Sequence, residues 1–108
     1  MLYGFRWMWL IVFFDLPVGT KAEKRTAAKF RKDLQKDGYT MLQWSVYARP
    51  CRSLDRIQKH MARLKQVTPK MGSVRAMTVT EQQYARMELL VGKRLNEEQI
   101  GCEQLVLF

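Results

Sequence analysis

Near its start the chain has an unbroken apolar run, Met8–Phe14, that reads Met-Trp-Leu-Ile-Val-Phe-Phe. Side chains alternate between the two faces of a strand, so a strand without a polar position must be covered on both faces. With Trp7 the run is about eight residues long, and a membrane-spanning helix needs about 20. Arg6 before it imitates a signal peptide, but no small-residue cleavage site follows. We therefore predict a central strand that ends in a turn at Pro17, in a soluble, cytoplasmic protein.

Two helices are predicted from their caps. Thr20 and Glu23 have the spacing of a capping box, and the helix they begin should run to about Asp37, where Gly38 stops it. Ser53 caps a second helix of about thirteen residues. The residues expected to face the core are Ala27, Phe30 and Leu34 in the first helix, and Leu54, Ile57, Met61 and Leu64 in the second.

The other segments favour strands. Tyr39–Arg49 is rich in β-formers but long for one strand, so we expect a kink or short hairpin near Gln43 and Trp44, with Pro50 ending the segment. Ser73–Thr80 predicts a fourth strand. Beyond it we expect a short helix over Glu81–Val91, with Tyr84, Met87 and Leu90 or Val91 inward, and a last strand over Leu105–Phe108.

This order predicts a single α+β domain over residues 1–108, with a ferredoxin-like βαββαβ core and an appended helix and strand. Right-handed crossovers place both main helices on one face of the sheet. The apolar first strand cannot leave the other face in water. We expect a twin subunit to cover it, which makes the protein a homodimer with its sheets packed face to face.

The charge indicates a polyanionic partner. The chain carries 19 Lys and Arg against 10 Asp and Glu, a formal net charge of +9. The excess lies in the first eighty residues, whereas residues 81–108 hold 3 basic and 5 acidic groups. Each helix carries cations at i, i+4, i+7 and i+11, on the side away from its apolar face. The candidate nucleic-acid-binding residues are Arg25, Lys29, Lys32 and Lys36 on the first helix, and Arg52, Arg56, Lys59 and Arg63 on the second.

Few side chains suggest chemistry. Asp15 ends the first strand beside a turn, where an Asp commonly caps the backbone but can also bind Mg²⁺. One carboxylate makes a poor site, whereas two across a dimer axis would make a credible one. His60 has no Cys or Asp at ligand spacing and is expected to be a lone surface or half-buried residue. Cys51 and Cys102 show no zinc or disulfide pattern. The stacking strand of an RNA-recognition motif is also missing.

Several segments, in this order, resemble one known family. They are Phe-Phe-Asp-Leu-Pro at 13–17, a basic helix, Gly38-Tyr39, Gln43-Trp44-Ser45-Val46-Tyr47 with Arg49, Ser73-Val74-Arg75, and Val79-Thr80-Glu81 with Gln83-Tyr84. Together they are similar to the CRISPR-associated endoribonuclease family, the small partner of the spacer integrase, in the variety found in type II systems. The resemblance covers about residues 8–108. Residues 1–7 form an N-terminal extension that departs from it.

The resemblance implies a ferredoxin-like homodimer that acts as a metal-dependent endonuclease on single-stranded RNA or double-stranded DNA. It makes Asp15 the catalytic, Mg²⁺-binding residue, contributed by each protomer near the two-fold axis. It also implies that the dimer bridges integrase subunits and holds spacer DNA in antiviral defence, and that residues 103–108 pair with the partner protomer. Two alternatives stay open: a non-catalytic basic scaffold that binds nucleic acid, and a toxin-like ribonuclease of the same fold.

Overall fold

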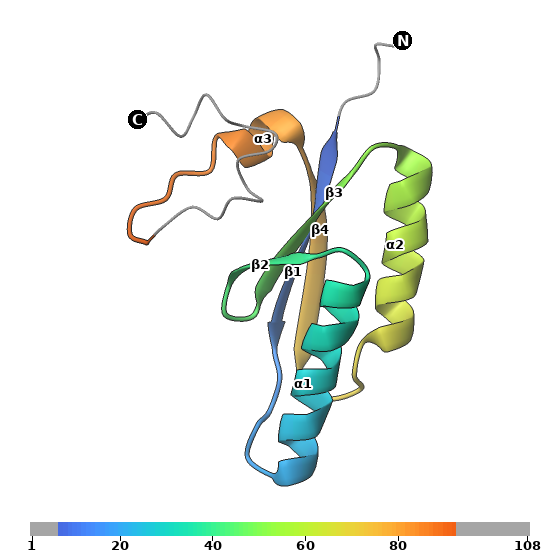
Figure 1. Ribbon diagram of the computed structural model, residues 1–108, viewed down its shortest axis with the longest axis vertical. Helices are drawn as coiled ribbons and strands as arrows, with labels where there is room; N and C mark the ends of the chain where they lie inside the picture. The colour runs from blue at the N-terminus through green and yellow to red at the C-terminus, as the bar shows by residue number, and fades with distance from the viewer. Residues whose placement is uncertain (1–6, 93–108) are drawn as a thin grey trace.

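The structure is a computed structural model that describes residues 7–92 (Figure 1). The predicted strand at 105–108, the expected pairing of residues 103–108 and Cys102 lie outside this range, as do residues 1–6 of the expected extension. The elements, in chain order, are β1 (Met8–Asp15), α1 (Lys21–Lys36), β2 (Thr40–Gln43), β3 (Val46–Cys51), α2 (Leu54–Val67), β4 (Ser73–Thr80) and α3 (Glu81–Ala85).

The four strands form one antiparallel sheet in the order β2-β3-β1-β4. The apolar strand β1 lies inside the sheet, hydrogen-bonded to β3 on one edge and to β4 on the other. Helices α1 and α2 lie side by side on one face, and the short α3 lies at the opposite side, near the start of β1 (Figure 1). The predicted ferredoxin-like α+β fold is therefore confirmed for the single chain.

Alternation along β1 builds two cores. Leu10, Val12 and Phe14 point into the helix layer, where they pack against residues such as Phe30 and Leu34. The odd-numbered residues point to the other face. There Trp9 and Ile11 form a smaller cluster with Ala48 and Tyr84. Toward the end of β1 the second face opens, because Phe13 and Asp15 are exposed.

The predicted caps form as the sequence indicates. Thr20 Oγ1 accepts a hydrogen bond from the Glu23 backbone N–H at 3.1 Å, and Glu23 Oε1 accepts from the Thr20 N–H at 3.0 Å. Gly38 follows the helix with φ +92°, a left-handed conformation that glycine adopts without a Cβ clash. Ser53 Oγ caps α2 by accepting from the Arg56 N–H at 3.1 Å. The three predicted core residues of α1 are all buried.

The hairpin expected near Gln43 and Trp44 is present, and it joins β2 to β3. Pro50 was predicted to end this segment, but β3 runs on to Cys51. Pairing of β3 with β2 stops at Ala48, opposite Thr40. Beyond that point β3 has an unpaired edge, where the missing N–H of a proline is tolerated.

Two predictions about helices were wrong. The helix expected over Glu81–Val91 ends at Ala85, and Leu90 and Val91 are 86% and 91% exposed. Only Tyr84 of the predicted inward set is buried, because α3 makes a single turn over the sheet and the chain then leaves it. In α2, Leu54 is the first residue of the helix and is 61% exposed.

Candidate functional site at the end of the first strand

Asp15 is the last residue of β1, and its side chain is exposed. Its odd number places it on the face opposite the helices, the face of Trp9 and Ile11. Asp15 is the first polar residue after the apolar run, and it lies at the end of β1 where the second face is open. The site is thus a carboxylate at the open end of a buried strand.

The strand β4 supplies the polar neighbours of Asp15. Ser73 is its direct partner in the register, and Arg75 pairs with Phe13. Arg75 therefore lies on the same face as Asp15, diagonally across the two strands, where side chains come within reach of each other. Both Ser73 and Arg75 are exposed. Sequence reasoning missed this pair because only the register of β1 with β4 shows the neighbourhood.

A glycine fixes the approach of β4 to Asp15. Gly72 has φ +84°, and a Cβ at this position would lie 2.6 Å from the Asp15 carbonyl oxygen. That distance is too short for a side chain, so the loop between α2 and β4 can pass this close only with glycine. The contact holds the start of β4 against the end of β1 and sets the position of Ser73.

The donor set at this end fits Mg²⁺ only in part. A carboxylate oxygen is the type of ligand that Mg²⁺ takes, usually one or two per ion together with waters. No group of three His, Cys, Asp or Glu side chains that could hold a metal occurs in residues 7–92. One chain therefore contributes one suitable carboxylate, Asp15, and a two-carboxylate site requires a second copy.

The predicted cations are all exposed, and all but Arg52 lie on the helices α1 and α2. Within the described residues, two of them form ion pairs: Lys29 Nζ with Asp33 Oδ2 at 2.9 Å, and Arg63 Nη1 with Asp37 Oδ1 at 2.8 Å. Arg52 was predicted to lie on α2, but it precedes the helix, because Ser53 is the N-cap. Its guanidinium instead lies over the Trp7 ring, 4.8 Å from the centroid. The cations of α1 and α2 and the Asp15 side chain thus lie on opposite faces of the sheet.

His60 is not the lone histidine that the sequence suggested. It is 2% exposed, and its Nδ1 lies 2.7 Å from Asp37 Oδ2. A carboxylate only accepts hydrogen bonds, so Nδ1 carries the proton. Nε2 is buried without a partner among the described residues. Asp37 caps the end of α1, and with His60 and Arg63 it ties α1 to α2. No sequence pattern indicates this pair, since Asp37 and His60 are 23 positions apart and meet only in the folded chain.

The surroundings shift the pKa of both partners. Burial lowers the pKa of His60 below its ordinary value of 6.5, and this outweighs the hydrogen bond to Asp37. Burial alone would raise the pKa of Asp37, but hydrogen bonds from His60 and Arg63 hold it below its ordinary value of 3.8. A neutral His60 that donates to an ionised Asp37 satisfies both shifts. It also avoids an unpaired, charged N–H at the buried Nε2.

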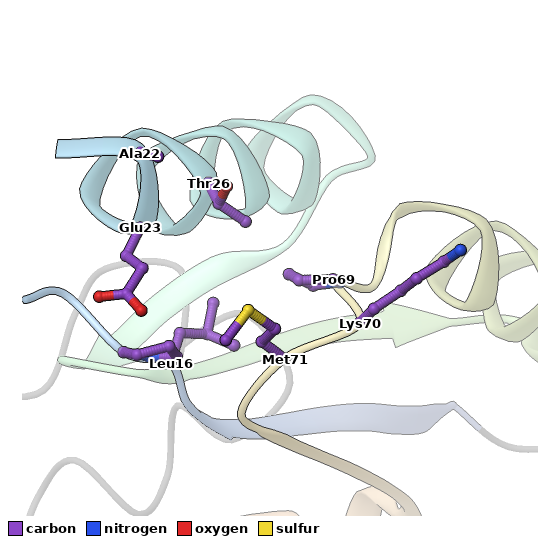
Figure 2. Close-up of a pocket in the computed structure, with 8 residues that line it drawn as sticks. Leu16, Ala22, Glu23, Thr26, Pro69, Lys70 and Met71 are labelled. Atoms are coloured by element: carbon purple, nitrogen blue, oxygen red, sulfur yellow. The ribbon is translucent and has the colours of Figure 1, made fainter. Parts of the chain in front are cut away.

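A pocket of about 260 Å³ lies between the first turn of α1 and the loop after α2 (Figure 2). Its lining is largely apolar and includes Leu16, Pro69 and Met71. Glu23 points toward it, but this carboxylate already accepts the N–H groups of Gly19 and Thr20 at the helix cap. The one carboxylate that lines the pocket thus already caps a helix through Oε1, and Asp15 stays the candidate.

The fold and the site define a small, basic α+β protein of the ferredoxin-like class with a carboxylate at the end of its central strand. Residues 8–87 match the family described as CRISPR associated protein Cas2, and the chain belongs to that family. No helix in residues 7–92 is both long and apolar enough to cross a membrane.

Similar proteins cover nearly the whole chain. A protein of Acidovorax ebreus is 50% identical over 102 residues, which are 94% of this chain and 100% of that protein. A protein of Parvibaculum lavamentivorans is 43% identical over 101 residues, which are again 94% of this chain and 100% of that protein. One of Flavobacterium psychrophilum is 39% identical over 107 residues, 99% of this chain and 93% of that protein. Each carries the name CRISPR-associated endoribonuclease Cas2.

The buried His60 predicts a pH dependence of stability. Its folded-state pKa lies below 6.5, so the unfolded chain binds more protons below about pH 6.5. The free energy of unfolding should therefore fall as the pH is lowered from about 7 to 5. Asp37, whose pKa is also lowered, adds a further loss as the pH falls through about 4 and below. Chemical denaturation at several pH values measures both.

His60→Gln provides the comparison, because His60 is the single histidine of the chain. The variant should lose about 1–3 kcal/mol at neutral pH, since it replaces a hydrogen bond to a charged group. Its stability should then change little between about pH 7 and 5. A wild-type protein that becomes more stable in acid, or a variant with the wild-type slope, would contradict the assignment.

Proposed function

We propose that this chain is a Mg²⁺-dependent endonuclease of a CRISPR system, acting on single-stranded RNA as a homodimer. The observation that carries the proposal is the position of Asp15, an exposed carboxylate on the sheet face that the helices leave open. The names of the similar proteins support ribonuclease chemistry. Cleavage of double-stranded DNA is a further activity to be tested with the same protein.

The open face supports the homodimer. Near the end of β1 it exposes Phe13, and opposite Ile11 it exposes Met77, with exposures of 38% and 49%. Large apolar side chains on a flat sheet face are suited to packing against another sheet. A two-fold arrangement of such faces would bring the two Asp15 carboxylates toward one axis. Each protomer would then supply half of the site.

The chemistry divides between Asp15 and Arg75. The two Asp15 carboxylates would hold Mg²⁺, which when bound activates water and neutralises charge on the phosphodiester. Arg75 lies on the same face and can pair with a phosphate oxygen of the substrate. Its guanidinium would orient the scissile phosphate beside the carboxylates. The hydroxyl of Ser73, opposite Asp15, can hydrogen-bond to the sugar–phosphate backbone of the substrate.

The helix layer supports a second role, holding a nucleic-acid duplex. Its exposed cations lie away from the open face, so they do not compete with the dimer contact. Phosphate contacts from such a surface bind nucleic acid without reading its sequence. In this role the dimer bridges integrase subunits and holds spacer DNA, and the scaffold works whether or not Asp15 is active. A basic scaffold without nuclease activity is therefore the alternative function.

Asp15→Asn should abolish cleavage of single-stranded RNA, because it keeps the size of the side chain and removes the charge that holds the cation. The loss should be at least about 100-fold, since a metal supplies several kcal/mol of transition-state stabilisation. Cleavage is measured with Mg²⁺ and with EDTA. Asp55→Asn, at an exposed Asp in the first turn of α2, is the control and should stay active. Undiminished cleavage by Asp15→Asn would rule out the catalytic assignment, and inactive wild-type protein would favour the scaffold.

The double variant Arg56→Gln/Lys59→Gln should weaken duplex DNA binding for unrelated sequences alike. The slope of log affinity against log salt should fall by about 0.9 for each phosphate that the variant no longer neutralises. Lys65→Gln/Lys70→Gln removes the same charge from exposed positions outside the predicted stripe and should leave the slope closer to wild type. Equal effects of the two double variants would show that net charge, and not this face of α2, binds the duplex.

A further inference from the structure

The turn between β2 and β3 holds an unusual pair of residues, Trp44 and Ser45. Trp44 is 71% exposed, although tryptophan has a large apolar surface that is normally buried for the most part. Ser45 has φ +71°, a left-handed conformation that side chains other than glycine rarely adopt. The turn therefore exposes a large aromatic ring, and its next residue has a left-handed backbone conformation.

Arg31 of α1 supports this ring from one side. Its guanidinium carbon lies 3.6 Å from the centroid of the Trp44 ring. Nη2 of Arg31 donates to Ser45 Oγ at 2.9 Å, and the same guanidinium lies 5.0 Å from the Phe14 ring. Arg31 is itself half-buried. The Trp44 ring is thus held on a fixed cation, and the rest of its surface is open.

The platform formed by Trp44 and Arg31 lies at the end of the sheet that carries Asp15. The Ser45 carbonyl oxygen accepts a hydrogen bond from the Phe14 N–H at 3.1 Å, and Phe14 precedes Asp15 in β1. Alternation of side chains puts Phe14 and the platform on the helix side of this end, and Asp15 on the open side. A strand of nucleic acid that crosses the end of the sheet would meet both.

We propose that the Trp44–Arg31 platform stacks an unpaired nucleobase of the single-stranded substrate. Bases stack on aromatic side chains with little regard to sequence, because every base has a π-face. The guanidinium behind the ring adds positive charge beside the exposed face, which favours nucleic acid over an apolar protein segment. In a regular duplex the bases are already stacked and paired, so the platform would select single strands.

The inference rests on the proposed binding of nucleic acid, but not on cleavage. It is therefore tested by binding in the Asp15→Asn background, where a substrate stays intact. The probes are a short oligoadenylate RNA and a DNA duplex of equal length, both fluorescently labelled and compared by anisotropy at one fixed salt concentration. The variants are Trp44→Ala and Trp44→Phe, with Leu54→Ala as a control at another exposed apolar residue.

Trp44→Ala should weaken oligoadenylate binding about 5- to 100-fold, the range for loss of one stacked base. Duplex binding should change less than about twofold, and Trp44→Phe should recover most of the affinity because it keeps an aromatic face. Unchanged oligoadenylate binding by Trp44→Ala, or equal weakening for both probes, would overturn the proposal. A thermal unfolding curve like that of the parent shows that the turn still folds. If the wild-type protein does not cleave RNA but the Trp44 variants change affinity as expected, the nuclease proposal is wrong and the stacking proposal is supported.

Discussion

The structure depends on one strand being covered from both sides. No residue between Met8 and Phe14 can face water at low cost, so β1 must lie inside the sheet and between two layers. The helix layer covers the even-numbered side chains. The odd-numbered ones need a second cover, and burial of each large apolar side chain is worth about 1.5–3 kcal/mol. The cover of that second face determines the surroundings of Asp15 and which groups can contact its carboxylate.

Within residues 7–92, the chain covers the second face only near the start of β1. There α3 places the Tyr84 ring on Trp9, with centroids 3.8 Å apart and planes 8° from parallel. Trp9 Nε1 also donates to Glu81 Oε1 at 2.6 Å, which satisfies the one polar atom of the buried indole. The helix ends at Ala85, so α3 does not cover Phe13 and Asp15, which are both exposed. The same short helix that completes the core thereby leaves the candidate site open.

Much of the fold follows from local sequence signals. The two main helices and their caps, the hairpin and the four strands were predictable because each rests on neighbouring residues, such as Thr20 with Glu23. Asp15 was predictable as a candidate because it ends the apolar run. The C-terminal end of α3 was not, since Met87 and Leu90 continue the helical spacing of Tyr84 and nothing local shows that the sheet no longer lies beneath them.

The rest of the site depends on contacts between distant segments. Arg75 joins Asp15 only through the register of β4 with β1. His60 looked isolated because its partner, Asp37, ends the other helix. Trp44 was predicted to lie near a kink or hairpin, but only the fold places Arg31 under its ring. In each case the side chain was visible in the sequence, and its neighbour was set by the tertiary fold.

We expect a second copy of the chain to cover the open face and complete the Asp15 site. Sedimentation equilibrium at micromolar concentration measures the dimer for the wild-type protein and for Met77→Glu. RNA cleavage is measured on the same samples. The wild type should be a dimer that cleaves, whereas the buried charge should make Met77→Glu a folded monomer that does not. Leu54→Glu, which adds the same charge on the helix side, should stay dimeric and active. A wild-type monomer that cleaves RNA, or a Met77→Glu dimer with full activity, would contradict the claim.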